Sequence, residues 1–250
     1  MPVNFDHSLL SPSLRGPRAA LPVMFSEWVP ASLLDVGCGL GVWTKAALKF
    51  GIEDVLGLDG EDIVRRGGVI SSTNFRHQLV HEPFSLGRSF EVALCLEVGE
   101  HLAKEHARIL IGNLVDHADV VYFSAACPGQ PGQHHVNCQW PQYWQELFNE
   151  RGYVCDDSIR WKLWNVAPLG FCYRQNLIVA RRDPRQAGKE ARIRPVVHPE
   201  LVDLWEADAA ADRRLLWLKQ VEQGSQTIGW YLSLPIRALG RKLNRRIFVR

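Results

Sequence analysis

The fold is decided by residues 33–43, which read Leu33-Leu34-Asp35-Val36-Gly37-Cys38-Gly39-Leu40-Gly41-Val42-Trp43. This stretch passes from an apolar run through a glycine-rich turn into a segment with helical spacing. Glycines adopt backbone angles that are closed to other residues, and they let the main chain approach a ligand without a Cβ atom. Residues 31–60 therefore predict the nucleotide-binding first half of a Rossmann-like α/β domain.

The spacing of the glycines separates two classes of ligand. The dinucleotide fingerprint G-x-G-x-x-G requires glycine at position 42, where this chain has Val42 and the pattern is instead G-x-G-x-G. This departure disfavours a nicotinamide oxidoreductase. Asp35, two residues before the first glycine, supplies a carboxylate that can anchor the amides of the turn or an ammonium group of the ligand.

The whole stretch resembles motif I of the class I S-adenosylmethionine-dependent methyltransferases. The resemblance implies S-adenosylmethionine as the cofactor, held by Asp35, Gly37, Gly39 and Gly41. The alternative is a tight strand-to-helix connection that binds no ligand.

Two further positions extend the expected cofactor site. Asp59 ends the second apolar run, at the separation at which Rossmann-like folds place a carboxylate on ribose hydroxyls. After the third strand the family presents an acidic residue and then an apolar one beside the adenine ring, and this chain has Gln78 and Leu79 there. The Gln78 amide oxygen can still accept a hydrogen bond from an adenine amino group.

Short apolar segments alternate with helical patterns along the chain. We expect strands at 32–36, 55–59, 75–80, 91–96 and 120–125, helices at 42–50, 61–71, 102–116 and 140–151, and an antiparallel edge from 154–163 and 172–180. The alternation predicts an α/β fold with a Rossmann-like, mostly parallel seven-stranded sheet, helices on both faces and a C-terminal helical extension.

Three segments are expected along the chain. Residues 1–30 form an N-terminal arm and helix, irregular through about residue 20, that folds over a site; residues 31–182 form the S-adenosylmethionine-binding domain; and residues 183–250 form a linker and a helical extension.

Acidic and imidazole side chains follow the fourth expected strand. Glu97, Glu100 and His101 share one face if a helix begins by Glu97, and the segment resembles the E-V-x-E-H-L stretch of many class I methyltransferases. One interpretation makes His101 or a neighbour a general base for the methyl acceptor. The E-x-x-E-H spacing also resembles the metal site of small-RNA and quinone-precursor O-methyltransferases. That resemblance implies a divalent Mg, Mn or Zn ion on Glu97, Glu100 and His101, with help from His134 or His135. A capped helix start with a satisfied histidine is the third interpretation.

A long loop rich in Pro and Gly follows the fifth expected strand, and it carries His134 and His135. Loops of this length in compact domains are usually functional or mobile, so both histidines are candidates for the acceptor end of the site. The arrangement P-G-Q…H-H-V-N-x-Q-W-P-x-Y-W resembles a bacterial subgroup of methyltransferase-domain proteins. Trp140 and Trp144 are expected as core aromatics of the next helix.

Composition bounds the environment and the partners. The net charge of +2 does not by itself indicate a nucleic-acid partner, and the six cysteines form no C-x-x-C pair. With neither a signal-peptide pattern nor a run of roughly 20 apolar residues, we expect a cytoplasmic protein with buried free thiols. Residues 235–250 have helical spacing with a basic face, which fits a solvated helix, an RNA contact or a peripheral membrane contact.

The function expected from these features is methyl transfer from S-adenosylmethionine to an oxygen or nitrogen of a small-molecule or glycan acceptor. Glu97, His101, His134 and His135 are the expected catalytic residues. The alternatives are a metal-assisted O-methyltransferase and a non-catalytic protein that binds the cofactor as a scaffold.

Overall fold

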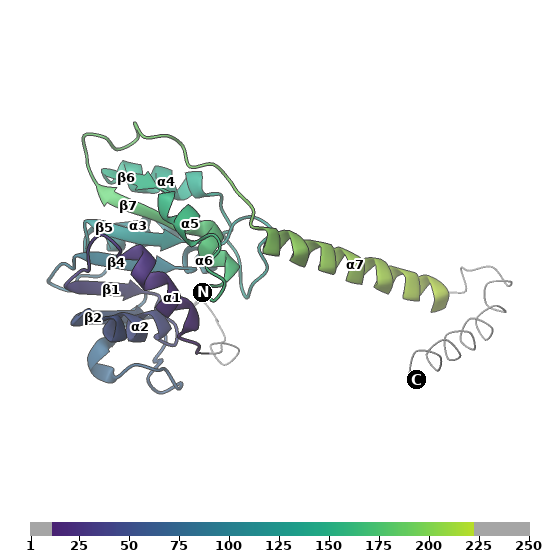
Figure 1. Cartoon of the computed structure of the whole chain (residues 1–250), viewed down its shortest axis with the longest axis horizontal. Helices are drawn as coiled ribbons and strands as arrows, with labels where there is room; N and C mark the ends of the chain where they lie inside the picture. The colour runs from purple at the N-terminus through teal and green to yellow at the C-terminus, as the bar shows by residue number, and fades with distance from the viewer. Residues whose placement is uncertain (1–11, 223–250) are drawn as a thin grey trace. The chain divides into compact units, whose positions relative to one another are not determined.

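The computed structural model describes residues 12–222. The chain divides into two units at the boundary between His198 and Pro199. The first unit is built on a seven-stranded sheet with the order β3-β2-β1-β4-β5-β7-β6 (Figure 1). The strands are β1 (Ser32–Val36), β2 (Asp54–Asp59), β3 (Phe75–His77), β4 (Val92–Leu96), β5 (Val120–Ser124), β6 (Tyr153–Asp156) and β7 (Ile178–Arg182).

The direction of the strands confirms the expected fold class. Neighbours among β1 to β5 pair in parallel, and β7 pairs antiparallel with both β5 and β6. Such a sheet places the carboxyl ends of β1, β2 and β4 side by side at one edge, where ligands bind in open α/β sheets.

Helices cover both faces of the sheet because each buried strand sends alternate side chains to opposite sides. Leu34 and Ala93 lie in one apolar core, with side chains of α3 (Ala107–Val115) and α4 (Pro141–Glu150). Leu33 and Leu94 lie in the other, with side chains of α1 (Arg15–Met24), α2 (Val42–Phe50) and α5 (Ser158–Leu163). The site therefore rests on a sheet that is buried on both faces.

Several expected elements were wrong in their type or extent. Residues 61–71 form turns rather than a helix, in a segment where Gly67 adopts a φ of +83°. The helix expected at 102–116 begins only at Ala107, after the 3-10 turns η3 (Gly99–His101) and η4 (Lys104–His106). β3 ends at His77 and is preceded by the 3-10 turn η2 (Ser72–Asn74).

The antiparallel edge also contains helices that we did not expect. Residues 154–163 and 172–180 contribute β6 and β7 as predicted, but α5 follows β6, and α6 (Phe171–Asn176) precedes β7. Helix α1 likewise lies partly within the arm expected to be irregular up to residue 20. Pro17 is tolerated there because the first turn of a helix has no internal partner for its N–H groups.

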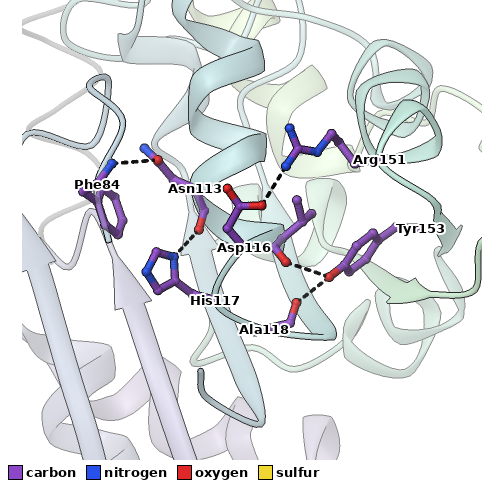
Figure 2. A network of polar contacts seen from close by, with 8 residues as sticks. Phe84, Asn113, Asp116, His117, Ala118, Arg151 and Tyr153 are labelled. Atoms are coloured by element: carbon purple, nitrogen blue, oxygen red, sulfur yellow. Dashed lines mark hydrogen bonds and ion pairs between the residues drawn. The ribbon is translucent and has the colours of Figure 1, made fainter. Parts of the chain in front are cut away.

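Polar contacts tie the segment after β3 to helix α3 (Figure 2). The Asn113 side chain accepts a hydrogen bond from the Phe84 N–H at 3.2 Å and donates to the carbonyls of Val80 and Glu82 at 3.0 and 2.9 Å. His117 Nδ1 donates to the Asn113 carbonyl at 2.7 Å, which leaves Nε2 to accept from the Leu86 N–H at 3.1 Å. Buried polar groups so satisfied hold the 80–86 segment in one conformation.

The same network extends to the far end of α3, where Figure 2 shows Tyr153 and Arg151. The Tyr153 hydroxyl lies 2.8 Å from the Ala118 carbonyl, and Arg151 Nη2 lies 2.7 Å from Asp116 Oδ1. These contacts join β6 and the preceding turn to the end of α3.

The second unit begins with α7 (Pro199–Glu222), which agrees with a helical extension within residues 183–250. The basic helix expected at 235–250 lies outside the described residues. Among the described helices, none combines the length and the apolarity needed to span a membrane. All six cysteines are free, and four of them are buried.

Candidate functional site

A cavity of about 720 Å³ opens at the carboxyl ends of β1, β2 and β4. Its lining comes from the turn after β1, the end of β2, the segment after β3, the end of β4, the loop after β5, α6, and residues next to and within α1. β1 lies between β2 and β4, so the chain order reverses at this edge. Ligands of open α/β sheets bind at such a switch point.

The glycine turn has the backbone that the sequence predicted. Gly37 and Gly41 have φ values of +75° and +80°. A Cβ on Gly37 would lie 2.5 Å from Val98 Cγ2, and one on Gly41 would lie 2.7 Å from Ile70 Cγ1. The turn is also held from β2, because the N–H groups of Gly37 and Cys38 both donate to the Leu58 carbonyl. Neither glycine can gain a side chain without moving a neighbour.

Asp59 lines the cavity at the end of β2. Its carboxylate accepts hydrogen bonds from the N–H groups of Gly39 at 2.9 Å and Glu61 at 3.1 Å. The Asp59 carboxylate thus links the glycine turn to β2, the strand whose end is expected to lie beside the ribose of the cofactor.

Asp35 acts on the start of α2 rather than on the amides of the glycine turn. Its Oδ2 accepts hydrogen bonds from the Thr44 hydroxyl at 2.7 Å and the Thr44 N–H at 3.1 Å. Burial raises the pKa of Asp35 to about 6, against the lowering effect of the Thr44 hydrogen bonds, and the charge of Asp59 raises it further. A cationic ligand group would stabilise the ionised form of this carboxylate.

The expected cofactor residues divide into two groups. Those that line the cavity are Asp35, Gly37, Gly39, Asp59 and Leu79. Gly41 and Gln78 are not among the lining residues. Gly41 packs against Ile70, and the Gln78 amide lies 3.3 Å from the Leu79 carbonyl, to which it donates.

No helix begins at Glu97, so the condition under which Glu97, Glu100 and His101 would share one helix face is not met. Glu97 has a left-handed φ of +57°, and its N–H donates to both the carbonyl and the hydroxyl of Ser124, at 2.9 and 3.1 Å. Pairing with β5 thus continues past the end of β4 and prevents a helical turn. Only the short 3-10 turn at Gly99–His101 follows.

Glu100, His101 and His135 form one cluster, which we call the imidazole cluster. One ligand atom of each lies within 4.8 Å of the others. The two rings are 5.1 Å apart, and His135 Nδ1 lies 3.0 Å from the Gln130 carbonyl. Within the described part of the chain, neither carboxyl oxygen of Glu100 has a hydrogen-bond partner.

Burial sets the protonation of this cluster. It raises the pKa of Glu100 well above its usual range, and the neighbouring charge of Glu97 raises it further. Burial also lowers the pKa of His101 to about 4, with a second contribution from His135. The cluster thus favours a neutral carboxylic acid and a neutral imidazole unless a cation is present.

Glu97 belongs to a second cluster that the sequence did not predict. Its carboxylate accepts hydrogen bonds from Gln130 Nε2 at 2.7 Å and from Asn176 Nδ2 at 3.2 Å, and Asn176 Nδ2 also donates to Gln130 Oε1 at 2.8 Å. Gln130 could have been found in the P-G-Q segment of the loop. Asn176 carried no signal, because its segment had the pattern of a strand.

His134, a candidate site residue, and Trp144, a predicted core residue, do not line the cavity. His134 is exposed, has a φ of +48° and is not among the lining residues. Trp144 is buried, with its ring 4.9 Å from that of Phe123, as the prediction of a core aromatic required. Of the loop histidines, only His135 lines the cavity.

Comparison with known proteins agrees with this fold. A family model described as a methyltransferase domain matches residues 16–158. The methyltransferase domain of a bacterial CtHen1 aligns with a TM-score of 0.50 at 15% identity, over 68% of this chain and 100% of that one. The magnesium protoporphyrin IX methyltransferase of Synechocystis PCC 6803, solved with S-adenosylhomocysteine bound, aligns with a TM-score of 0.46 at 18% identity, over 66% and 80%. No curated protein matches the chain.

The match to the family model spans more than half of the chain, including the glycine turn and the segment after β4. The chain therefore belongs to the methyltransferase-domain family. With the sheet order and the cavity described above, the protein is a class I methyltransferase that uses S-adenosylmethionine.

Proposed function

We propose that this protein transfers the methyl group of S-adenosylmethionine to an oxygen or nitrogen of a small-molecule or glycan acceptor. The observation that supports the proposal is one cavity lined both by Gly37, Gly39 and Asp59 and by Glu97, His101 and His135. When bound, S-adenosylmethionine supplies a methyl group on a positively charged sulfur. The protein's task is then to align donor and acceptor, exclude water and accept a proton.

Residues at the far end of the cavity are the candidates for the proton acceptor. The His101 imidazole is neutral near pH 7, but burial lowers its pKa to about 4, so it accepts a proton less readily than an ordinary histidine unless a neighbouring negative charge stabilises the imidazolium. Glu97 offers a carboxylate in the same part of the cavity, and His135 lies beside His101. We assign proton removal to this group and leave His134 outside it.

A second candidate is metal-assisted O-methylation, favoured by the imidazole cluster. One carboxyl and two imidazole groups within 4.8 Å, with both Glu100 oxygens lacking hydrogen bonds, suit a divalent Mg, Mn or Zn ion. Glu100, His101 and His135 would hold the ion, which would lower the pKa of an acceptor hydroxyl. Glu97, the fourth residue expected in this site, instead accepts hydrogen bonds from the side-chain amides of Gln130 and Asn176.

The experiment that tests the proposal is detection of S-adenosylhomocysteine released from S-adenosylmethionine, with a panel of hydroxyl and amine acceptors, before and after chelation. Release that depends on an acceptor supports the enzyme, and its loss on chelation with recovery on adding Mn²⁺ supports the metal route. Cofactor binding without release for any hydroxyl or amine acceptor would contradict the proposed acceptor class, and turnover unchanged by chelation would exclude the metal.

A further inference from the structure

The far end of the cavity has a charge pattern that bears on the acceptor. We call the part lined by Glu97, Glu100, His101, Gln130 and His135 the acceptor end. We propose that the acceptor end selects an amine, or a comparable cationic group that donates hydrogen bonds, and that Glu97 determines this specificity. The inference rests on the proposed function and narrows its acceptor class.

A directed chain of amide hydrogen bonds holds the Glu97 carboxylate. The His198 N–H donates to Gln175 Oε1 at 2.7 Å, Gln175 Nε2 donates to Asn176 Oδ1 at 3.0 Å, and Asn176 Nδ2 donates to Gln130 Oε1 at 2.8 Å. Gln130 and Asn176 then each donate to one oxygen of Glu97. Since every donor points towards Glu97, the chain favours a fixed negative charge there.

The carboxylate retains capacity for a ligand. Each carboxylate oxygen has about two acceptor sites, and each Glu97 oxygen accepts one amide hydrogen bond in the described structure. Glu97 is partly exposed and lines the cavity. A donor entering the acceptor end can therefore bind the carboxylate without displacing Gln130 or Asn176, which we regard as positioning residues.

The backbone of Glu97 is held in a costly conformation. A left-handed φ is unfavourable in a residue other than glycine and persists only where its surroundings enforce it. Here the Glu97 N–H bonds to Ser124 and the side chain bonds to the two amides, which together enforce a φ of +57°. Such conformations concentrate at functional sites.

The strand order places Glu97 beside the glycine turn. β4 is the neighbour of β1 in the sheet, and Val98, the residue after Glu97, packs against Gly37, so a ligand bound along the ends of β2 and β1 would present its far part to the end of β4. Glu97 directly follows β4. The acids that line the cavity throughout are Asp35, Asp59, Glu61, Glu97 and Glu100. At the acceptor end, the Glu97 carboxylate held by Gln130 and Asn176 attracts a cationic acceptor and repels a carboxylate or a phosphate.

Two nucleoside probes test the proposal without knowledge of the acceptor. S-adenosylhomocysteine has an uncharged sulfur, whereas sinefungin carries an ammonium group on the carbon that replaces it, directed as the methyl group would be. Titration calorimetry of the full chain, with chelator present, should show that sinefungin binds about tenfold or more tightly than S-adenosylhomocysteine. One charge-assisted hydrogen bond between the ammonium group and Glu97 contributes enough binding free energy for this difference. Glu97→Gln should remove most of that preference, and Gln130→Met should reduce it partway.

Matched variants keep the test decisive. Glu61→Gln removes an acid that lines the same cavity next to Asp59, so it should leave the ratio of the two dissociation constants unchanged. If Glu97→Gln does not fold, Glu97→Asn replaces it, because asparagine tolerates a left-handed backbone. Equal binding of both probes by the wild type, or an unchanged ratio in the Glu97 variant, would overturn the inference. If neither probe binds the wild type, the proposed function fails instead.

Discussion

Adding one methyl group to Gly37 tests whether the glycine turn is as tightly constrained as its geometry indicates. Alanine at a left-handed position costs roughly 1–2 kcal/mol in backbone strain. At Gly37 the new Cβ would also lie 2.5 Å from Val98 Cγ2, and overpacking of this kind typically costs a further 1–3 kcal/mol or so. Gly37→Ala should therefore lower the free energy of unfolding by roughly 2–5 kcal/mol.

Gly51 provides the matched control. Its φ of +107° imposes the backbone strain, but a Cβ there would meet nothing within 4 Å. Gly51→Ala should therefore cost only the strain, and the difference between the two variants isolates the contact with Val98. Urea unfolding measures both. The double variant Gly37→Ala, Val98→Ala should recover part of that difference as a coupling energy between the two positions.

The same variants should separate in their affinity for S-adenosylhomocysteine. Gly37→Ala should weaken its binding about tenfold or more, because the turn lines the cavity, and Gly51→Ala should leave it unchanged. If Gly37→Ala is no more destabilising than Gly51→Ala, or if Val98→Ala gives no coupling, the account of the turn is wrong.

Three further predictions concern stability and the metal. Asn113→Leu removes three hydrogen bonds from the 80–86 segment and should lower the free energy of unfolding in urea by about 2–4 kcal/mol; a loss below about 1 kcal/mol would show that the segment is held by packing instead. Burial raises the native pKa of Asp35 from 3.8 to about 6, so the native state binds this proton more tightly than the unfolded state does. Stability from Asp35 is full below about pH 4 and is lost by about pH 6, on the order of 3 kcal/mol. Unfolding of the wild type and Asp35→Asn across this range should therefore diverge, and parallel profiles would contradict the burial argument. If the metal route operates, Mn²⁺ should raise the melting temperature of the wild type and not that of His135→Ala; equal shifts in both proteins would place the ion elsewhere.

The sequence predicted the fold well where the signal was local. The strands β1 and β4 and the G-x-G-x-G turn could be recognised from the sequence. Buried parallel strands consist mainly of apolar residues, and positive φ angles favour glycine, so each leaves a clear local pattern. The expected helix at 61–71 failed because helical spacing in a short segment does not outweigh the turns around Gly67. Helix α6 was missed because its residues have no apolar period.

The site was predictable only in part because its members meet through tertiary pairing. Helical spacing would have gathered Glu97, Glu100 and His101 on one face. Instead, the hydrogen bonds from the Glu97 N–H to Ser124 prevent a helix from starting there, and Glu97 lies in a different cluster from Glu100 and His101. Asn176 reaches Glu97 from 79 positions along the chain. No local pattern in a single sequence reports such a contact.

The central claim, that the cavity at the ends of β1, β2 and β4 binds S-adenosylmethionine, is tested most directly by titration calorimetry. The full chain should bind S-adenosylhomocysteine at one site per chain. Asp59→Asn should weaken that binding about tenfold or more, because the carboxylate that holds the Gly39 N–H and faces the expected ribose loses its charge. Absence of binding at millimolar ligand, or equal affinity in the variant, would contradict the account.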